Sequence, residues 1–296
     1  MNIAKRLNKQ SIHIVLGPTA SGKTDFALIL AKQLQAEIIS ADAFQVYKYM
    51  DIGTAKVSQN IQKTIPHHLI DIRYPNEPYT LYDFLSLSNS AIDILKKKEK
   101  PIIICGGTGL YINAFLYNYD LTHQPRTPDI RHHLEQQLKR EGKEAFWERL
   151  NKIDPKTANC IHPNNTRRVL RSLEIHLQTK KKPSDIKRKE MHARTDCTLW
   201  GMAQEKTQLH ERINTRVDNM IQNGLVEEVD ALLKRGYREN CLAFQALGYK
   251  ECILYLKGSL EKKEMIDLIK SKTRQFAKRQ LTWFKRLDNV HWLNPS

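Results

Sequence analysis

The chain of 296 residues is long enough for a large hydrophobic core, either as one large domain or as two smaller ones. It has no apolar run of about 18 residues, no recognisable secretory signal and only five scattered cysteines, so we predict a cytoplasmic protein without a membrane-spanning helix or a cysteine-based zinc site. The net charge of +16 favours a polyanionic partner such as nucleic acid or a membrane surface, although a basic surface also serves solubility alone.

The first motif along the chain is a phosphate-binding loop. Its pattern is G-x-x-x-x-G-K-[ST], and its residues are Gly17, Pro18, Thr19, Ala20, Ser21, Gly22, Lys23 and Thr24. The apolar run at 12–16 predicts a buried strand before the loop, and residues 25–34 predict a helix after it. This order directs backbone N–H groups and the positive end of a helix at a phosphate. Lys23 adds a mobile charge, and the Thr24 hydroxyl can reach a metal ion, so the motif predicts a polyphosphate ligand without specifying ATP.

Two later strands are predicted to end beside this loop. Residues 37–42 predict a strand that ends at Asp42, and residues 101–105 predict a strand that runs into a second glycine-rich turn at 106–109. Ligands of open α/β sheets bind beyond the carboxyl ends of the strands, so we expect Asp42 near the phosphate-binding loop. The strand at 101–105 lacks the terminal aspartate that holds Mg²⁺ in conventional P-loop NTPases. We therefore predict that Asp42 serves a chemistry other than ATP hydrolysis.

Two shorter patterns lie between and beside these strands. Residues 66–71 predict a turn followed by a short strand. We interpret the paired histidines of this stretch as structural, because no third metal ligand lies at a recognisable spacing. Residues 80–98 predict a helix that begins with a capping arrangement of Thr80 and Asp83.

The character of the chain changes at residue 121. Residues 124–128 predict a linker. Short helices without strands are then predicted at 129–140, 143–150, 156–160 and 165–178. These features predict an inserted small all-helical domain over residues 120–196.

Strand character returns at 198–202, and the remainder of the chain predicts helices, the last of them long and basic over 261–286. The predicted fold is therefore α/β. Residues 1–119 and 197–296 form a P-loop parallel-sheet core flanked by helices, and the all-helical domain is inserted between them.

Basic residues gather in two stretches. Residues 167–194 contain ten basic and three acidic residues, and residues 270–286 contain seven basic residues and no acidic one. Such clustering is typical of a nucleic-acid-binding surface. We interpret Phe276, Trp283 and Phe284 of the second stretch as core residues, although aromatic side chains between basic ones would also suit single-stranded RNA.

Several further motifs follow the phosphate-binding loop in a characteristic order. They are DAFQVY at 42–47, MDIGTAK at 50–56, PHHLID at 66–71, GGTGLY at 106–111, HPN at 162–164, RR at 167–168, GYK at 248–250 and AKRQLTW at 277–283. With these motifs the chain resembles bacterial members of the tRNA isopentenyltransferase family, and the resemblance extends from about residue 12 to residue 293.

The resemblance implies a reaction. Members of this family transfer a dimethylallyl group from dimethylallyl diphosphate to N6 of the adenosine 3′-adjacent to the anticodon, in tRNAs that read codons beginning with U. The P-loop holds the isoprenoid diphosphate with Mg²⁺ rather than ATP. By this resemblance Asp42 is the general base on the adenine amine, and Thr24, Lys23 and Arg216 bind the diphosphate, with Thr24 also next to the Mg²⁺. Such chemistry requires the adenine to flip out of its stack.

The resemblance also implies partners and an RNA-binding surface. The partners are dimethylallyl diphosphate and the anticodon stem-loop of tRNA, and we expect a monomer without a membrane partner. The positions that match the tRNA contacts of the family are Asp42, Ala43, Phe44, Gln45, Thr108, Arg131, Arg167, Arg168, Val169, Leu170, Arg171, Gln245, Ala246, Leu247, Gly248, Tyr249, Lys250, Lys278, Arg279, Gln280, Leu281, Thr282, Trp283, Phe284 and Lys285.

The chain departs from the family pattern in one respect. The family commonly has serine after the catalytic aspartate, where this chain has Ala43, so the hydrogen bond of that hydroxyl is lost or replaced.

The residues leave two other functions open. The first alternative is a P-loop kinase of a small metabolite, with Asp42 as the base and the helical insert as a lid. The second is an RNA-binding protein in which the P-loop is only structural.

Overall fold

The computed structural model of this protein describes residues 12–119, 128–185 and 193–294. The chain divides into two compact units. The sheet unit joins the residues up to Tyr117 with those from Ala193 onward, and the helical unit lies within 118–192. Residues 124–127 of the predicted linker lie outside the described residues, and the independent folding of the insert stays a prediction.

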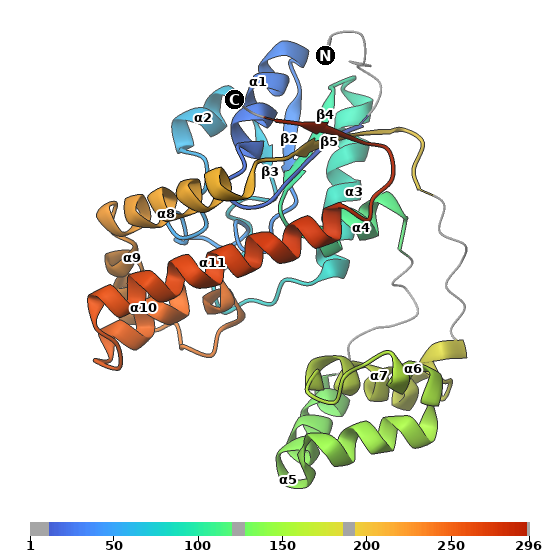
Figure 1. Ribbon diagram of the computed structural model, residues 1–296. Helices are drawn as coiled ribbons and strands as arrows, with labels where there is room; N and C mark the ends of the chain where they lie inside the picture. Colours follow the sequence, from blue (N-terminus) through green and yellow to red (C-terminus); the bar gives the residue numbers. More distant parts are fainter. Residues whose placement is uncertain (1–11, 120–127, 186–192, 295–296) are drawn as a thin grey trace. The chain divides into compact units, whose positions relative to one another are not determined.

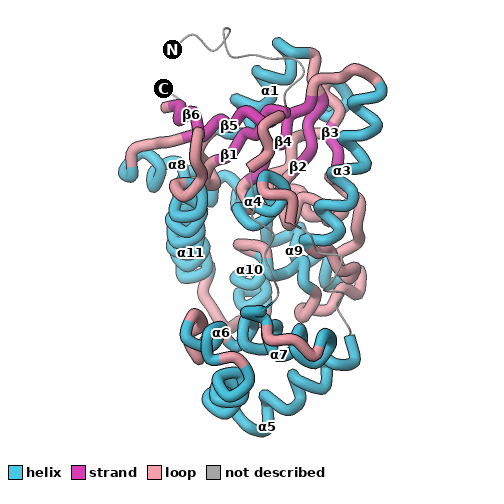
Figure 2. The backbone as a smooth tube through the Cα atoms, turned by 90° about the vertical axis from the view of Figure 1, so that its right-hand side faces the viewer, coloured by secondary structure: helices cyan, strands magenta, loops and turns pink. Residues whose placement is uncertain are grey.

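The sheet unit is built on one six-stranded sheet in which all neighbouring strands are parallel. The strand order is β3-β2-β4-β1-β5-β6, which the reader can follow in Figure 2. The strands are β1 (Ile12–Leu16), β2 (Glu37–Ser40), β3 (His67–His68), β4 (Ile102–Gly106), β5 (Cys197–Met202) and β6 (Val290–Leu293). This sheet confirms the predicted parallel α/β core.

Side-chain alternation along β1 separates two helical layers. Ile12, Ile14 and Leu16 belong to a core cluster that includes residues of α3 (Leu81–Lys97) and α4 (Gly109–Leu116). Val15 belongs to a second cluster, with α1 (Lys23–Leu34) and Ile65, which follows α2 (Gln59–Thr64). Because helices cover both faces of the sheet (Figure 1), its central strands are apolar on both sides, and this explains their continuous apolar runs.

Four helices follow β5 and join the cluster on the α3–α4 face. They are α8 (Lys206–Gln222), α9 (Leu225–Lys234), α10 (Tyr249–Leu256) and α11 (Lys262–Phe284). Helices α8 and α11 lie side by side (Figure 1), and two contacts of 2.7 Å link them, Lys270 to Asp218 and Arg274 to Asn214. The α8–α11 pair is therefore held by polar as well as apolar contacts.

Two strands differ from their predictions. The chain after residue 202 does not stay helical, because it ends in β6, which pairs with β5. A strand of four residues is too short to show a clear alternation of apolar and polar side chains, so its sequence does not predict such an edge strand. Likewise, His67 and His68 form β3 themselves instead of preceding a strand.

The helical unit has its own core. Its helices are α5 (Pro128–Ile153), α6 (Pro155–Asn159) and α7 (Thr166–Thr179), and its buried cluster includes Leu134, Phe146 and Leu150. Gly142 interrupts α5 with a positive φ of 83°, so α5 is two helices joined at this residue. This break agrees with the separate helices predicted at 129–140 and 143–150.

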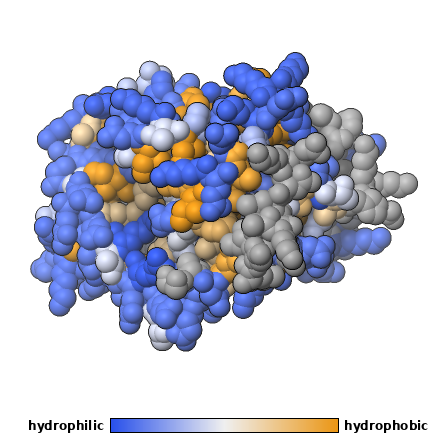
Figure 3. Space-filling model, turned by 90° about the horizontal axis from the view of Figure 1, so that it is seen from above, coloured by the Kyte–Doolittle hydropathy of each residue, from blue (hydrophilic) through white to orange (hydrophobic). Residues whose placement is uncertain are grey.

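The face shown in Figure 3 is mostly hydrophilic, with hydrophobic side chains exposed in limited areas. Such a surface agrees with the high share of charged residues, 27%. No helix within the described residues is long and apolar enough to cross a membrane.

Candidate functional site

The phosphate-binding loop lies between the end of β1 and the start of α1, as predicted. Helix α1 begins at Lys23, and Gly22 before it has a positive φ of 83°. A Cβ atom at Gly17 would lie 2.7 Å from the Ser21 Oγ, so only glycine fits there. Ser21 is fully buried, and its hydroxyl has no hydrogen-bond partner among the described residues. A buried hydroxyl without a hydrogen-bond partner is uncommon in folded proteins.

Lys23 stands in a positive environment. Its Nζ lies 3.3 Å from the Pro18 carbonyl oxygen. Burial lowers the pKa of Lys23, and the positive charge of Arg216 lowers it further, while Cys105 and Asp42 act in the opposite direction. The ammonium group therefore lacks a neighbour that fully compensates its charge.

Arg216 reaches this place from α8. Its Nε is buried and has no hydrogen-bond partner among the described residues. Burial lowers the pKa of the guanidinium, and the negative charges of Asp42 and Asp25 oppose this effect. Arg212, one helical turn earlier, is exposed. Arg216, and not the exposed Arg212, is therefore the arginine of α8 whose positive charge acts on Lys23, and two like charges in a partly buried place favour a negatively charged neighbour.

Asp42 lies two residues beyond β2, at the carboxyl end of the sheet. One carboxylate oxygen accepts hydrogen bonds from the backbone N–H groups of Phe44, at 2.9 Å, and Gln45, at 3.3 Å. No hydrogen bond to the other oxygen occurs within the described parts of the chain. The turn thus holds one oxygen of Asp42 and leaves the other free to accept a proton.

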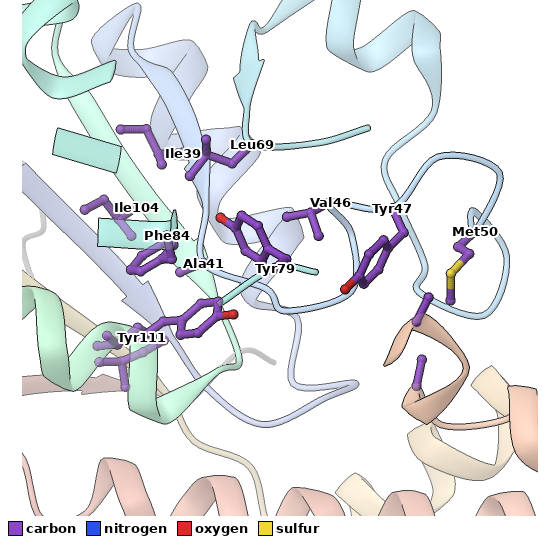
Figure 4. Close-up of a cluster of buried hydrophobic side chains, with 14 of the residues drawn as sticks. Ile39, Ala41, Val46, Tyr47, Met50, Leu69, Tyr79, Phe84, Ile104 and Tyr111 are labelled. Carbon is purple, nitrogen blue, oxygen red and sulfur yellow. The ribbon is translucent and has the colours of Figure 1, made fainter. Parts of the chain in front are cut away.

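The loop of Asp42 rests on buried aromatic rings. Figure 4 shows Ala41 beside Phe84 and Tyr111. The rings of Phe84 and Tyr111 stack with centroids 4.5 Å apart, and Tyr79 meets Tyr111 edge-on at 6.1 Å. Close packing beneath the loop restricts the position of its backbone.

The second glycine-rich turn lies directly against the Asp42 loop. A Cβ atom at Gly106 would lie 2.2 Å from the Ala41 carbonyl oxygen, so this approach requires glycine. The Thr108 hydroxyl accepts a hydrogen bond of 3.1 Å from the backbone N–H of Ala43, and the Thr108 N–H donates to Ala41 at 3.3 Å. The predicted contact residue Thr108 therefore holds the backbone on both sides of Asp42.

Gln280 connects this turn with the phosphate-binding loop. Its Oε1 accepts a hydrogen bond of 2.8 Å from the backbone N–H of Thr19, and its Nε2 donates one of 2.8 Å to the Gly107 carbonyl. The residue is 5% exposed, although its stretch was predicted to contact tRNA.

The MDIGTAK motif is held from α9. The carboxylate of Glu228 accepts hydrogen bonds from the backbone N–H groups of residues 51–53, and the Tyr249 hydroxyl donates to it at 2.6 Å. A Cβ atom at Gly53 would lie 2.4 Å from the Tyr249 ring. Burial raises the pKa of Tyr249 well above its ordinary value, and the charge of Glu228 adds to this effect. The MDIGTAK motif is therefore a loop that Glu228 and Tyr249 hold in place.

Burial divides the residues predicted to contact tRNA. The exposed ones in the sheet unit are Lys250, Lys278, Arg279, Thr282, Trp283 and Lys285. The half-buried ones are Asp42, Ala43, Phe44, Gln45, Thr108, Gln245, Leu247 and Leu281. The buried ones are Ala246, Gly248, Tyr249, Gln280 and Phe284, so their side chains are not available to RNA in this structure, because they complete the core or hold loops. Of the aromatic residues interpreted as core, Phe284 is buried, Phe276 is half-buried and Trp283 is 37% exposed.

The helical unit divides its predicted contacts in the same way. Arg167 and Arg168 are exposed, whereas Val169 and Leu170 lie in the core. Arg131 and Arg171 lie 3.9 Å and 3.0 Å from the carboxylate of Glu174, which is 2% exposed. These two arginines therefore also compensate a buried charge.

The structure contains no ready-made metal centre within the described residues, because no three His, Cys, Asp or Glu side chains converge. His68 Nε2 lies 2.7 Å from Glu37 and His67 Nδ1 lies 2.7 Å from the Ile65 carbonyl, in keeping with a structural role. Metal binding by the Thr24 hydroxyl, which lies in the first turn of α1, stays a prediction.

Sequence reasoning missed Glu228 and the bridging role of Gln280. Glu228 contacts residues up to 177 positions away, and Gln280 contacts Thr19 across 261 positions. Neither position stands out from a local pattern, since both side chains lie on otherwise ordinary amphipathic helices.

Comparisons with known proteins agree with this geometry. The IPP transferase family pattern matches residues 45–287. The tRNA dimethylallyltransferase of Alkaliphilus oremlandii is 45% identical over 289 residues, which cover 97% of this chain and 92% of that protein. The tRNA dimethylallyltransferase of Clostridioides difficile is 42% identical over 291 residues, with 97% and 93% coverage.

Solved structures give the same picture. The tRNA isopentenylpyrophosphate transferase of Bacillus halodurans is similar with a TM-score of 0.71 and 41% identity, covering 96% of this chain and 90% of that one. A eukaryotic dimethylallyltransferase studied while acting on tRNA is similar with a TM-score of 0.83 and 28% identity, covering 97% of this chain and 74% of that one.

Proposed function

This chain belongs to the IPP transferase family, and from that premise we propose that it transfers a dimethylallyl group from dimethylallyl diphosphate to tRNA. The acceptor is N6 of the adenosine 3′-adjacent to the anticodon, in tRNAs that read codons beginning with U, and the product released is diphosphate. The observation that carries the proposal is the buried Nε of Arg216, which has no hydrogen-bond partner among the described residues. The charge of this guanidinium acts on Lys23, and the charge of Asp42 acts on both cations.

The cations prepare the site for the leaving group. Two partly desolvated positive groups attract a diphosphate strongly, and they neutralise the charge that develops on it as the C–O bond breaks. The Ser21 hydroxyl and the backbone N–H groups at the start of α1 supply further donors. Donors held in fixed positions by the fold limit the reorganisation needed during the reaction.

The carboxylate prepares the nucleophile. The adenine amine is weakly nucleophilic because its lone pair is delocalised over the ring. As its nitrogen forms a bond to C1 of the dimethylallyl group, the bond from C1 to the diphosphate oxygen breaks and the oxygen keeps the electron pair. The free oxygen of Asp42 then takes the proton that the amine loses.

The site fits Mg²⁺ as the accompanying ion. Mg²⁺ keeps several waters and is usually bound by one or two protein groups together with phosphate oxygens. The Thr24 hydroxyl, in the first turn of α1, would be such a protein donor, and the described residues offer no cluster of three His, Cys, Asp or Glu side chains that would bind a metal by itself. When bound, Mg²⁺ would neutralise charge on the diphosphate.

Exposed basic residues support tRNA as the macromolecular partner. Lys278, Arg279 and Lys285 lie exposed on or just after α11, and Arg167 and Arg168 lie exposed on α7. Each can pair with a backbone phosphate, which positions the RNA without reading its sequence. The kinase alternative gains no support, since the relatives reported above are named as tRNA-modifying transferases.

One reaction tests the proposal. Purified protein is incubated with unmodified tRNA, Mg²⁺ and dimethylallyl diphosphate labelled in its isoprenoid carbon, and a second sample receives γ-labelled ATP instead. We expect label in the tRNA, located after nuclease digestion in a modified adenosine, and no transfer from ATP. Transfer from ATP to a small molecule, or no isoprenoid label in tRNA, would contradict it.

A further inference from the structure

We propose that Gln280 is a positioning residue, which keeps the phosphate-binding loop and the loop of Asp42 at the separation that transfer requires. The inference rests on the proposed function and adds a residue to it. Gln280 stands in a stretch expected to contact RNA, but it is 5% exposed and both ends of its amide are occupied within the protein.

The side-chain amide of Gln280 makes two hydrogen bonds. Oε1 accepts from the backbone N–H of Thr19, and Nε2 donates to the carbonyl of Gly107, both at 2.8 Å. These partners lie in the segments that follow β1 and β4, two strands that are neighbours in the sheet. A Cβ atom at Gly107 would lie 2.3 Å from Nε2, so the turn approaches the amide as closely as glycine allows.

The glycine-rich turn at 106–109, which Gln280 holds, in turn fixes the backbone around Asp42. Directly after Gly107, Thr108 binds the backbone of Ala41 and Ala43, the residues on either side of Asp42. A path of hydrogen bonds and intervening peptide bonds therefore runs from Thr19, which lies in the loop proposed to hold the diphosphate, to the backbone on both sides of the proposed base. Gln280 is the side chain of this path that comes from α11.

Helix α11, which carries Gln280, also packs against α8, the helix that carries Arg216. Ala277 of α11 forms a small cluster with Leu209 and Ile213 of α8, and Ala20 of the phosphate-binding loop packs against it. Arg216 extends from the same helix α8. The α8–α11 pair thus positions the guanidinium, the loop and the Asp42 turn together, with Gln280 as the polar contact between them.

This geometry matters because transfer needs the amine, C1 and the leaving oxygen aligned. A displacement of about 1 Å at such a centre lowers a rate about 100-fold. Methionine has a similar length to glutamine and no amide, so Gln280→Met removes both hydrogen bonds while filling the space. We expect kcat to fall about 10- to 100-fold, with tRNA affinity and its salt dependence within about twofold of the wild type.

The control is Thr273→Val on the same helix. Thr273 is 6% exposed and its hydroxyl donates to the Ile269 carbonyl, far from both loops, so its loss tests a buried hydrogen bond that is only structural. We expect wild-type kcat from this variant. In a double-mutant cycle, Gln280→Met and Thr108→Val should be non-additive in kcat, because both interrupt one path, whereas Gln280→Met and Thr273→Val should be additive.

The outcomes separate the possible roles. Wild-type kcat in Gln280→Met, with or without a lower melting temperature, would overturn the inference, and so would a main effect on tRNA affinity, which would make Gln280 an RNA contact. Additive effects of Gln280→Met and Thr108→Val on kcat would also show that the two residues do not act through one connected path between the loops. A wild-type protein that transfers no dimethylallyl group would instead refute the proposed function, and the inference with it.

Discussion

Replacing Arg216 with alanine should affect the free and the ligand-bound protein in opposite ways. In the free protein the guanidinium is partly buried, its Nε has no partner among the described residues, and it stands close enough to Lys23 to lower the pKa of that ammonium group. Removing it relieves repulsion between like charges. In the bound protein the same change removes a clamp on the diphosphate.

The magnitudes follow from general electrostatics. Two unit charges repel by about 4 kcal/mol at about 4 Å and an effective dielectric constant of about 20, and the repulsion falls in inverse proportion to their separation. This gain offsets the lost packing of the arginine stem, so we expect the melting temperature of the free variant within about 2 °C of the wild type. A hydrogen bond to a charged group contributes about 1.5–3 kcal/mol, so pyrophosphate should bind roughly 10- to 100-fold more weakly.

Calorimetric titration with pyrophosphate and Mg²⁺ measures the affinity, and thermal unfolding with and without pyrophosphate measures both stabilities. Arg212→Ala is the matched control, because Arg212 lies one turn earlier on the same helix and is exposed. Arg216→Lys restores the charge without the planar fork, and we expect it to recover little of the affinity.

Two results would refute this reasoning. A large fall in the melting temperature of Arg216→Ala without pyrophosphate would show that the guanidinium serves to stabilise the fold and not to bind an anion. Equal losses of pyrophosphate affinity in the Arg212 and Arg216 variants would show that only the overall charge matters.

Three further predictions concern other parts of the chain. Asp42→Asn keeps an oxygen for the turn but cannot take the proton, so kcat should fall by about 10²–10⁴ with the affinities and melting temperature unchanged; a large loss of pyrophosphate affinity would contradict the base assignment. Lys278→Ala should lower the salt-dependence slope of tRNA binding by about one, measured by filter binding. Burial acts to raise the pKa of Asp154, but hydrogen bonds from Thr157 and Ser184 outweigh it and lower the pKa to about 2. The ionised carboxylate therefore stabilises the helical unit above about pH 4, and this stabilisation disappears as the pH falls through about 2, which carboxyl NMR titration and acid unfolding of Asp154→Asn can check.

The sheet unit illustrates what local patterns predict well. The strand at 12–16, the loop at 17–24 and the helix after it were all predicted close to their observed bounds. The helix at 80–98 was predicted with its cap, and the capping box of Thr80 and Asp83 is present. These features depend on residues within a few positions of one another, so the sequence itself contains the information that determines them.

The candidate site depends only partly on such patterns. Lys23 and Thr24 follow from the loop motif, and Asp42 follows from its place after a strand, because parallel strands bring their carboxyl ends to one edge. The assignment of Arg216 to the diphosphate rests on the family resemblance. The structure adds that the positive charge of Arg216 lowers the pKa of Lys23, whereas Arg212 is exposed.

The sequence alone therefore determined the order of most elements of the sheet unit and the basic character of the chain, because short-range periodicity and composition encode them. Only the tertiary structure decided that Tyr249 and Phe284 are buried, that Glu228 holds the loop at 51–53, and that Gln280 joins Thr19 to Gly107. These contacts join residues more than 170 positions apart in the chain. Their partners are set by how strands and helices pack in three dimensions, which no local pattern specifies.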